Sequence, residues 1–299
     1  MEKNEKIAEI VGLSFGDGSL TRRKDRNTLR FQLRGDAKED REHYNTYIIP
    51  LFNEMVMIPV LNRKVSVVES KKSHRSYGIA VESNKIGRFL NQFGIPIGRK
   101  SELNIPIWIK NEKEFLISFL RGLLDTDGSV YCQKNYSLNI IKKHTQIRLK
   151  ISTTSKILVT EVKDALTTLG ILSFIRVNKK KNHHKTAYYV EVCGGIQIKK
   201  WFKMIGSKNP KHNTKYLVWE KFGFCPPYTK LQDRKAMLTG KKDPNLFYTS
   251  NGKWDAPIHT RGCLSGQKSK VEVEKSMFKS SKALWLSAFA GSNPVPRMI

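Results

Sequence analysis

Residues 120–128 read LRGLLDTDG, and residues 10–18 read IVGLSFGDG. The two stretches lie 110 residues apart and share a Gly-Leu pair and a closing Asp-Gly pair. Apolar residues recur at helical spacing before each stretch, and an extended segment of alternating character follows each one. Because glycine readily adopts the turn that ends a helix, each copy predicts a helix that stops at its Asp-Gly. The chain therefore contains an internal repeat.

The segments that follow the two motifs come in the same order. In the first half the pattern predicts strands at 19–23 and 28–34, a helix at 38–57, strands at 64–69 and 77–82, and a helix at 85–93. In the second half it predicts strands at 129–133 and 146–152, a helix at 155–169, strands at 172–178 and 187–193, and a helix at 196–205. The fold class is therefore α+β, with the order αββαββα occurring twice.

This repeat divides the chain into four parts. We expect a first repeat at 1–94, a linker that carries two prolines at 95–113, a second repeat at 114–235 and a C-terminal tail at 236–299. The tail is rich in Gly, Ser and Lys and has few periodic stretches, so it is expected to be poorly ordered.

The composition is strongly basic. The 299 residues include 54 Lys and Arg against 26 Asp and Glu, which gives a formal net charge of +28 and a pI near 10.0. A basic globular chain of this kind usually meets a polyanion. No apolar run approaches the roughly 20 residues that span a bilayer, and the polar start does not resemble a signal peptide. We expect an intracellular, cytoplasmic protein associated with the nucleoid and not with a membrane; an organellar location is the alternative.

Basic and polar residues alternate with apolar ones along the predicted strands. An antiparallel sheet with one face on helices and the other face open shows this alternation, but ordinary exposure does not explain its positive sign. We therefore expect a basic sheet surface, shaped like a saddle, that follows the backbone of double-stranded DNA. The candidate DNA-binding residues are Arg30, Gln32, Arg34, Lys64, Ser66, Arg148, Lys150, Arg176, Asn178 and Tyr189.

With these two motifs, residues 4–235 resemble the LAGLIDADG homing endonucleases in their single-chain, two-repeat form. The second copy is close to the ideal motif, and Arg99-Lys100-Ser101 with Ile105-Pro106 upstream is also typical of the family. The first copy departs from the motif at Phe15, where an acid often stands, but keeps the acid before the final glycine. The resemblance implies a monomer that cuts both DNA strands at a long specific site with Mg²⁺, or with Mn²⁺ in its place, and so promotes the mobility of its host intron.

The residues account physically for this resemblance. Two motif helices that pack side by side need close backbone approach, which Gly12, Gly16 and Gly122 permit, with the small Thr126 facing them. The helix ends would then bring two acids together, as catalytic residues and metal ligands. The metal ligands expected are Asp17, Asp127 and the backbone carbonyls of Gly16 and Thr126. Hard oxygen ligands of this kind suit Mg²⁺, which can support phosphodiester hydrolysis.

A second group of candidate catalytic residues surrounds the acids. In the family, one basic residue per half lies near the scissile phosphate, and Lys100 and Lys211 follow comparable helices 111 residues apart. Lys208 and Lys215 are rival candidates for the second position. Gln32 and Lys150 align across the halves and would project from a central strand beside the acids.

Other functions use this type of fold. One is an intron-RNA-binding maturase that aids splicing without cutting DNA, and host intron RNA is then a partner. Another is an intein, which we do not expect because residue 1 is not a nucleophile and the chain ends Met298-Ile299. A third is a regulator without the acids, which the retained Asp17 and Asp127 disfavour.

The final residues suggest an origin for the tail. Residues 291–294 read Gly-Ser-Asn-Pro, and the codons GGU-UCA-AAU-CCN for them resemble the T-arm of a transfer RNA. We expect the reading frame to run from its intron into a downstream transfer RNA exon. A chain truncated near Lys235 would then keep its activity.

Overall fold

The computed structural model describes residues 2–69, 76–100, 102–134, 143–178 and 186–249. The chain separates into two compact units, residues 1–246 and residues 247–299. Most of the predicted tail, with the Gly-Ser-Asn-Pro sequence, lies outside the described residues. In the described part, none of the helices combines the length and the apolar character needed to cross a membrane.

The first repeat begins with helix α1 (Glu5–Gly16) and the hairpin of β1 (Gly18–Arg23) and β2 (Thr28–Asp36). A helical run then comprises α2 (Arg41–His43), η1 (Tyr44–Ile48), α3 (Ile49–Phe52), η2 (Asn53–Met57) and α4 (Ile58–Leu61). The repeat closes with β3 (Val67–Glu69), β4 (Ser76–Glu82) and α5 (Asn84–Gln92). Its strands form an antiparallel sheet in the order β1-β2-β4-β3.

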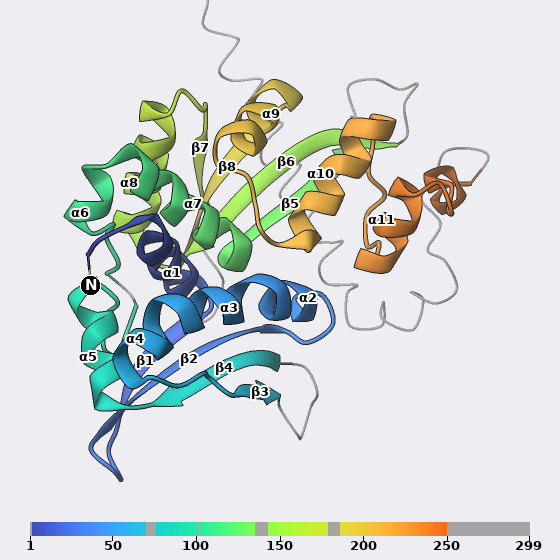
Figure 1. The fold of residues 1–299 in the computed structure, drawn as a ribbon. Helices are drawn as coiled ribbons and strands as arrows, with labels where there is room; N and C mark the ends of the chain where they lie inside the picture. Colours follow the sequence, from blue (N-terminus) through green and yellow to red (C-terminus); the bar gives the residue numbers. More distant parts are fainter. Residues whose placement is uncertain (1, 70–75, 101, 135–142, 179–185, 250–299) are drawn as a thin grey trace, which may run out of the picture. The chain divides into compact units, whose positions relative to one another are not determined.

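The second repeat follows the same plan (Figure 1). After the short α6 (Ile107–Lys110), which lies in the predicted linker, come α7 (Lys113–Asp127), β5 (Gly128–Lys134) and β6 (His144–Thr153). Then follow α8 (Lys156–Thr168), β7 (Phe174–Asn178), β8 (Ala187–Cys193) and α9 (Gly195–Met204). The strand order β5-β6-β8-β7 is that of the first sheet. The predicted α+β architecture of two αββαββα repeats is confirmed, with one sheet in each repeat.

Two details of the first repeat differ from the prediction. The helix expected at 38–57 is a longer helical run with two π-helical turns, and each turn is followed closely by a proline, Pro50 or Pro59. Proline lacks the N–H that would continue the regular bonding pattern, and local π turns accommodate this break. The strand expected at 64–69 is only Val67–Glu69, so Lys64 and Ser66 lie in the exposed segment before it.

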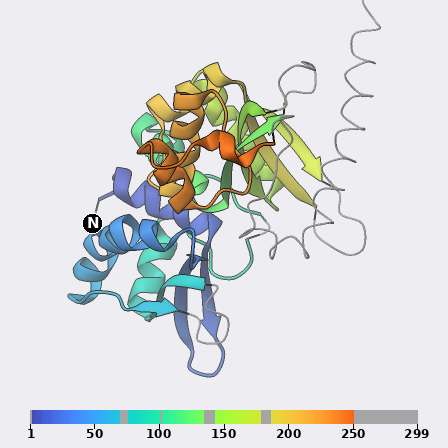
Figure 2. The same cartoon turned by 90° about the vertical axis from the view of Figure 1, so that its right-hand side faces the viewer.

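Helices α1 and α7 lie side by side and join the two repeats (Figures 1 and 2). A β-carbon on Gly12 would lie 2.2 Å from the carbonyl oxygen of Phe119, so the backbones are in direct contact there. At the helix ends, a β-carbon on Gly16 would lie 2.0 Å from Thr126 Oγ1. The predicted close approach of the motif helices is confirmed, and only glycine fits at these positions.

Each sheet has one buried and one partly open face. In β2 the buried residues alternate with half-buried polar ones, and β6 repeats the pattern. The inward residues are Leu29, Phe31, Leu33, Ile147, Leu149 and Ile151. The candidate DNA-binding residues of β2 and β6 therefore lie on the opposite, partly open faces, as the alternation predicts.

The folded region continues past the predicted end of the second repeat. Helices α10 (Pro210–Phe222) and α11 (Leu231–Leu238) and the turn η3 (Pro244–Phe247) follow α9. The Arg234 and Met237 side chains are fully buried. A tail beginning at residue 236 therefore starts inside α11, and truncation near Lys235 would remove the buried Met237.

Candidate active site and nucleic-acid interface

The two motif acids end the two central helices. Asp17 is the C-terminal cap of α1, and Asp127 is the last residue of α7. Each is followed at once by a glycine that begins the first strand of its own sheet. Because α1 and α7 pack against each other over their glycines, the two carboxyl groups come close enough to interact electrostatically.

Both acids hold their protons more tightly than free aspartic acid. Burial raises the pKa of Asp17 to about 7, and the charges of Asp127 and Asp40 add to the increase, against the opposing charges of Lys211 and Lys100. Burial also raises the pKa of Asp127 to about 6, against the charge of Lys100. Two acids that resist ionisation together form a site where added positive charge is strongly favoured.

Lys100 lies beside these acids, as the sequence predicts. Its ammonium donates to three carbonyl oxygens at the end of α1: Ser14 at 2.8 Å, Phe15 at 3.1 Å and Gly16 at 2.7 Å. Burial lowers the pKa of Lys100 to about 8, although Asp127 and Asp17 favour its charged form. All three N–H donors therefore face the helix end, and Lys100 acts on the acids through its charge.

Lys211 does not mirror Lys100. Its ammonium donates to Asp40 Oδ1 at 2.8 Å, and its charge reaches Asp17 from there. The carbonyl of Asp125, which matches that of Phe15, accepts instead from Asn209 Nδ2 at 3.0 Å. Asn209 therefore takes the place in the second repeat that Lys100 takes in the first, and our pairing of Lys100 with Lys211 is corrected.

The two rival lysines have other neighbours. Lys208 places its ammonium 5.7 Å from the ring centre of Tyr47. Lys215 is largely buried near Arg234 and Cys225, and burial lowers its pKa to about 8.

Gln32 and Lys150 occupy matching positions, as predicted from their alignment. Gln32 pairs with Ser19, two residues after Asp17, and Lys150 pairs with Ser129, two residues after Asp127. Their surroundings differ. In the amide orientation that satisfies both neighbours, Gln32 accepts from Arg30 at 3.2 Å and from Arg34 at 2.7 Å. Lys150 instead lies over the rings of Tyr131 and Tyr189, 5.7 Å and 5.0 Å from their centres.

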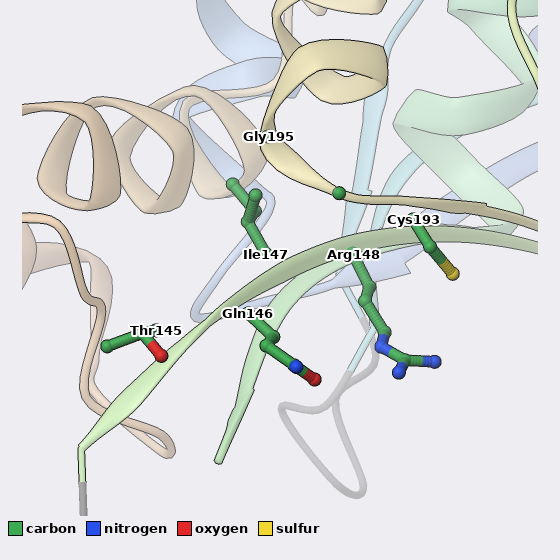
Figure 3. Close-up of a pocket in the computed structure, with 7 residues that line it drawn as sticks. Thr145, Gln146, Ile147, Arg148, Cys193 and Gly195 are labelled. Carbon is green, nitrogen blue, oxygen red and sulfur yellow. The ribbon is translucent and has the colours of Figure 1, made fainter. Parts of the chain in front are cut away.

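The other candidate DNA-binding residues mostly lie on the same sheet faces. Arg176 and Asn178 are in the edge strand β7, and Asn178 Nδ2 donates to the Tyr189 hydroxyl at 3.4 Å. Arg148 lies in β6 beside a pocket that Gln146, Cys193 and the start of α9 also line (Figure 3). Lys64 and Ser66 are exposed but outside the sheet, so they do not share its regular spacing.

The donor set at the acids suits a divalent cation. The two carboxylates and the nearby backbone carbonyls are hard oxygen ligands of the kind that Mg²⁺ prefers. Burial is the main cause of the raised pKa of both acids, and a bound cation would favour their ionised forms. Among the described residues, no group of three or more His, Cys, Asp or Glu side chains forms a metal site, so the two acids would need water or substrate oxygens as further ligands. The carbonyl of Gly16 is already an acceptor for Lys100.

Several polar residues at the site were not identified from the sequence. Asp40 joins the repeats, because its Oδ1 accepts from both Asn209 and Lys211. Asp125 is fully buried and accepts from the Ser207 hydroxyl and, at 2.8 Å, from the Lys208 amide. The dipeptide Asn209-Pro210 is a recognisable helix start, since Asn209 caps α10 and proline is favoured at the first helical position. No sequence signal identified Asp40.

The chain is similar to known proteins in both sequence and structure. Residues 114–206 match the family model of the LAGLIDADG-like domain. Over 228 residues the chain is 29% identical to the replication factor C small subunit of Methanocaldococcus jannaschii, covering 73% of this chain and 12% of that protein. It is 28% identical over 141 residues to the tRNA-splicing ligase RtcB of the same organism, covering 44% of this chain and 14% of the ligase. The chain thus spans about an eighth of these relatives.

Solved structures show a similar arrangement. The complex of I-DmoI with DNA and Mn is similar at 19% identity and a TM-score of 0.46, covering 68% of this chain and 96% of that chain. The N-terminal LAGLIDADG domain of DUF199/WhiA is similar at 15% identity and a TM-score of 0.40, covering 68% of this chain and 81% of that chain. Residues 114–206 thus match a LAGLIDADG-like domain, and the first repeat has the same order of helices and strands as the second.

Proposed function

We propose that this protein is a site-specific homing endonuclease that hydrolyses one phosphodiester bond in each strand of a long DNA duplex. The observation that carries the proposal is the pair Asp17 and Asp127. They are buried, electrostatically interacting acids with raised pKa values at the ends of two packed helices, and each immediately precedes the first strand of a basic sheet. Two acids related by a repeat suit a substrate with two similar strands.

The chain's own residues have separate roles in this proposal. The sheet residues around Gln32 and Lys150 would hold the duplex, and Asp17 and Asp127 would hold Mg²⁺, or Mn²⁺ in its place. A bound divalent cation would supply charge stabilisation and activation of water at the phosphate. Lys100 opposes the rise in the pKa of both acids and adds positive charge beside the substrate. One chain supplies both acids and both sheets, so we propose that it acts as a monomer associated with the nucleoid.

The DNA substrate that we expect follows from the proposed role in intron mobility. A protein that promotes mobility of its host intron should cut the version of the locus that lacks the intron. The test is to join the two DNA segments that flank the reading frame's intron and incubate this duplex with the protein and Mg²⁺. Metal-dependent double-strand cleavage near the junction supports the proposal. Binding of host intron RNA with faster splicing, and no cleavage of the duplex, would support a maturase instead.

A further inference from the structure

One buried acid lies on the basic face of the second sheet. Glu191 in β8 is 7% exposed. Its Oε1 accepts from the Tyr131 hydroxyl at 2.8 Å and from Arg148 Nη1 at 3.3 Å, and its Oε2 lies 3.5 Å from Arg176 Nε. These three partners come from β5, β6 and β7, so Glu191, in β8, contacts all three of the remaining strands of the sheet.

This acid is ionised despite its burial. Burial alone would raise the pKa of Glu191, but the hydrogen bond from Tyr131 and the charges of Arg148 and Arg176 outweigh burial and hold the pKa below its usual value. A surface that only neutralises phosphates gains nothing from a fixed negative charge, which repels the DNA backbone. The carboxylate therefore needs another explanation.

The first sheet has no such acid at the matching position. Glu191 pairs with Lys150 across β8 and β6, whereas Ala80 pairs with Gln32 across β4 and β2. In the first sheet the neutral Gln32 holds the neighbouring arginines. The open faces of the two sheets thus hold their arginines differently, by a neutral amide in the first sheet and by a carboxylate in the second, although the strand order is the same.

Arg148 is the residue that Glu191 positions most closely. Its side chain is 25% exposed, against 59% for Arg176. It extends to the same side of the sheet as Gln146 and Cys193, away from Ile147 (Figure 3). The hydrogen bond found among the described residues uses only Nη1, so other N–H groups of the guanidinium remain available for a ligand. A fixed arginine with free paired donors suits the O6 and N7 atoms of guanine in a major groove.

We propose that Glu191 is a specificity-determining positioning residue that holds Arg148 to read a guanine in the half-site bound by the second repeat. This inference rests on the proposed function, because it requires a DNA duplex on the sheet. The negative charge makes a phosphate a poor ligand at this place, so the arginine reads a base edge. Arg176, which is more exposed, is left to contact the backbone.

The test is a selection of bound duplexes from a randomised library, with EDTA present so that metal-dependent cleavage does not deplete them. The wild-type protein is compared with Glu191→Ala, Glu191→Gln, Arg148→Ala and the double variant Arg148→Ala/Glu191→Ala. We expect the wild type to select guanine at one position of one half-site. Arg148→Ala and Glu191→Ala should lose that preference at the same position, by roughly 5- to 150-fold. The double variant should lose no more than Arg148→Ala alone.

Glu191→Ala should weaken the preference for guanine but should not weaken the affinity for a random duplex. Removing the Glu191 charge should leave that affinity unchanged or raise it, and should make its salt dependence steeper, because a repulsive charge leaves the surface. A loss of packing alone would weaken both kinds of binding. Glu82→Gln is the matched control, since Glu82 lies near Arg23 and Arg26 in the first repeat. It removes one charge and should keep the guanine preference.

The outcomes separate the two proposals. If the wild type selects no duplex sequence, the proposed function fails and this inference falls with it. If it selects a sequence and Glu191→Ala keeps the guanine preference, only this inference is overturned. Thermal melting identifies a variant that fails to fold. If Glu191→Ala fails to fold, Arg148→Ala decides, and a retained guanine preference in that variant also overturns the inference. In Glu191→Gln the amide oxygen can accept from Tyr131 and Arg148, as Gln32 accepts from its arginines, so this variant should keep part of the preference.

Discussion

A β-carbon on Gly122 would lie 2.4 Å from the carbonyl oxygen of Glu9, a distance that side-chain carbons do not reach in folded proteins. The neighbour is backbone of the packed helix and cannot rotate away. Gly122 thus sets the separation of α7 from α1, and with it the separation of Asp127 from Asp17.

Gly122→Ala should therefore push the two helices apart. Overpacking at a rigid contact costs typically 1–3 kcal/mol, so we expect a loss of roughly 3 kcal/mol in the free energy of unfolding, measured by urea denaturation. Asp164→Ala on the exposed side of α8 is the control and should change stability little. Equal stability of Gly122→Ala and wild type would contradict the close approach.

Asp17→Asn should stabilise the metal-free protein at alkaline pH. The folded pKa is about 7 against 3.8 for the unconstrained group, so unfolding releases a proton between these values. Stability from this group is complete below about pH 3.8 and is lost as the pH rises through 7. At pH 8 the variant should gain on the order of 2 kcal/mol, since one unit is worth about 1.4 kcal/mol.

Thermal melts at pH 5 and pH 8 with EDTA measure this effect. The gain should be larger at pH 8. Asp25→Asn is the control, because the hydrogen bond from Arg23 lowers the pKa of that exposed acid, and it should show no comparable gain. If Asp17→Asn were less stable than the wild type at pH 8, the ionised Asp17 carboxylate would not destabilise the folded protein.

Lys211→Met should shift the pH profile of cleavage upward. Lys211 is bound to Asp40, and its charge lowers the pKa of Asp17. Without it, Asp17 ionises at higher pH, and single-turnover cleavage at pH 6–9 should need more alkaline conditions. Removing one partner of a buried pair should also cost roughly 3 kcal/mol of stability.

Two further variants make this test specific. Asp40→Asn/Lys211→Met removes both charges and should return the profile toward that of wild type. Lys208→Met, which loses the contact with Tyr47, should leave the profile in place. An unshifted profile in Lys211→Met would show that Lys211 has no electrostatic role at the acids.

The C-terminal boundary of the folded protein can be tested by truncation. A chain that ends after Thr249 keeps α11, η3 and the buried Phe247, and should melt as the full chain does. A chain that ends after Lys230 loses Arg234, which donates to Thr214 and Thr229 and pairs with Glu39 of the first repeat at 3.2 Å. That chain should melt at a markedly lower temperature. Identical melting of both truncated chains would place α11 outside the cooperative fold.

Repetition is what made the fold and the two acids predictable. Gly12, Gly122, Asp17 and Asp127 each have a partner 110 residues away, and a residue that recurs in the same surroundings stands out from chance. The alternation in β2 and β6 similarly predicted which side chains share a face. Each repeated motif and each alternating strand is a short stretch of sequence, so its structure follows from the rules of helix and strand geometry.

The contacts that break the symmetry could not be predicted in this way. Asp40 and Asn209 are separated by 169 residues and meet only because the repeats pack together. Lys211 follows a helix as Lys100 does, yet it turns to Asp40, since Asn209 already occupies the helix end. Glu191 looks like an ordinary strand acid until three partners from three strands converge on it. The two π turns depend on prolines whose effect on a helix varies with packing.

The most direct test of the central claim is single-turnover cleavage of the intron-less duplex by the wild type and by Asp17→Asn, Asp127→Asn and the double variant. All four proteins should bind the duplex in EDTA. With Mg²⁺ the wild type should cut both strands, each single variant should lose double-strand cleavage, and the double variant should be inactive. Robust double-strand cleavage by the double variant would contradict the assignment of Asp17 and Asp127 as the catalytic, metal-binding acids.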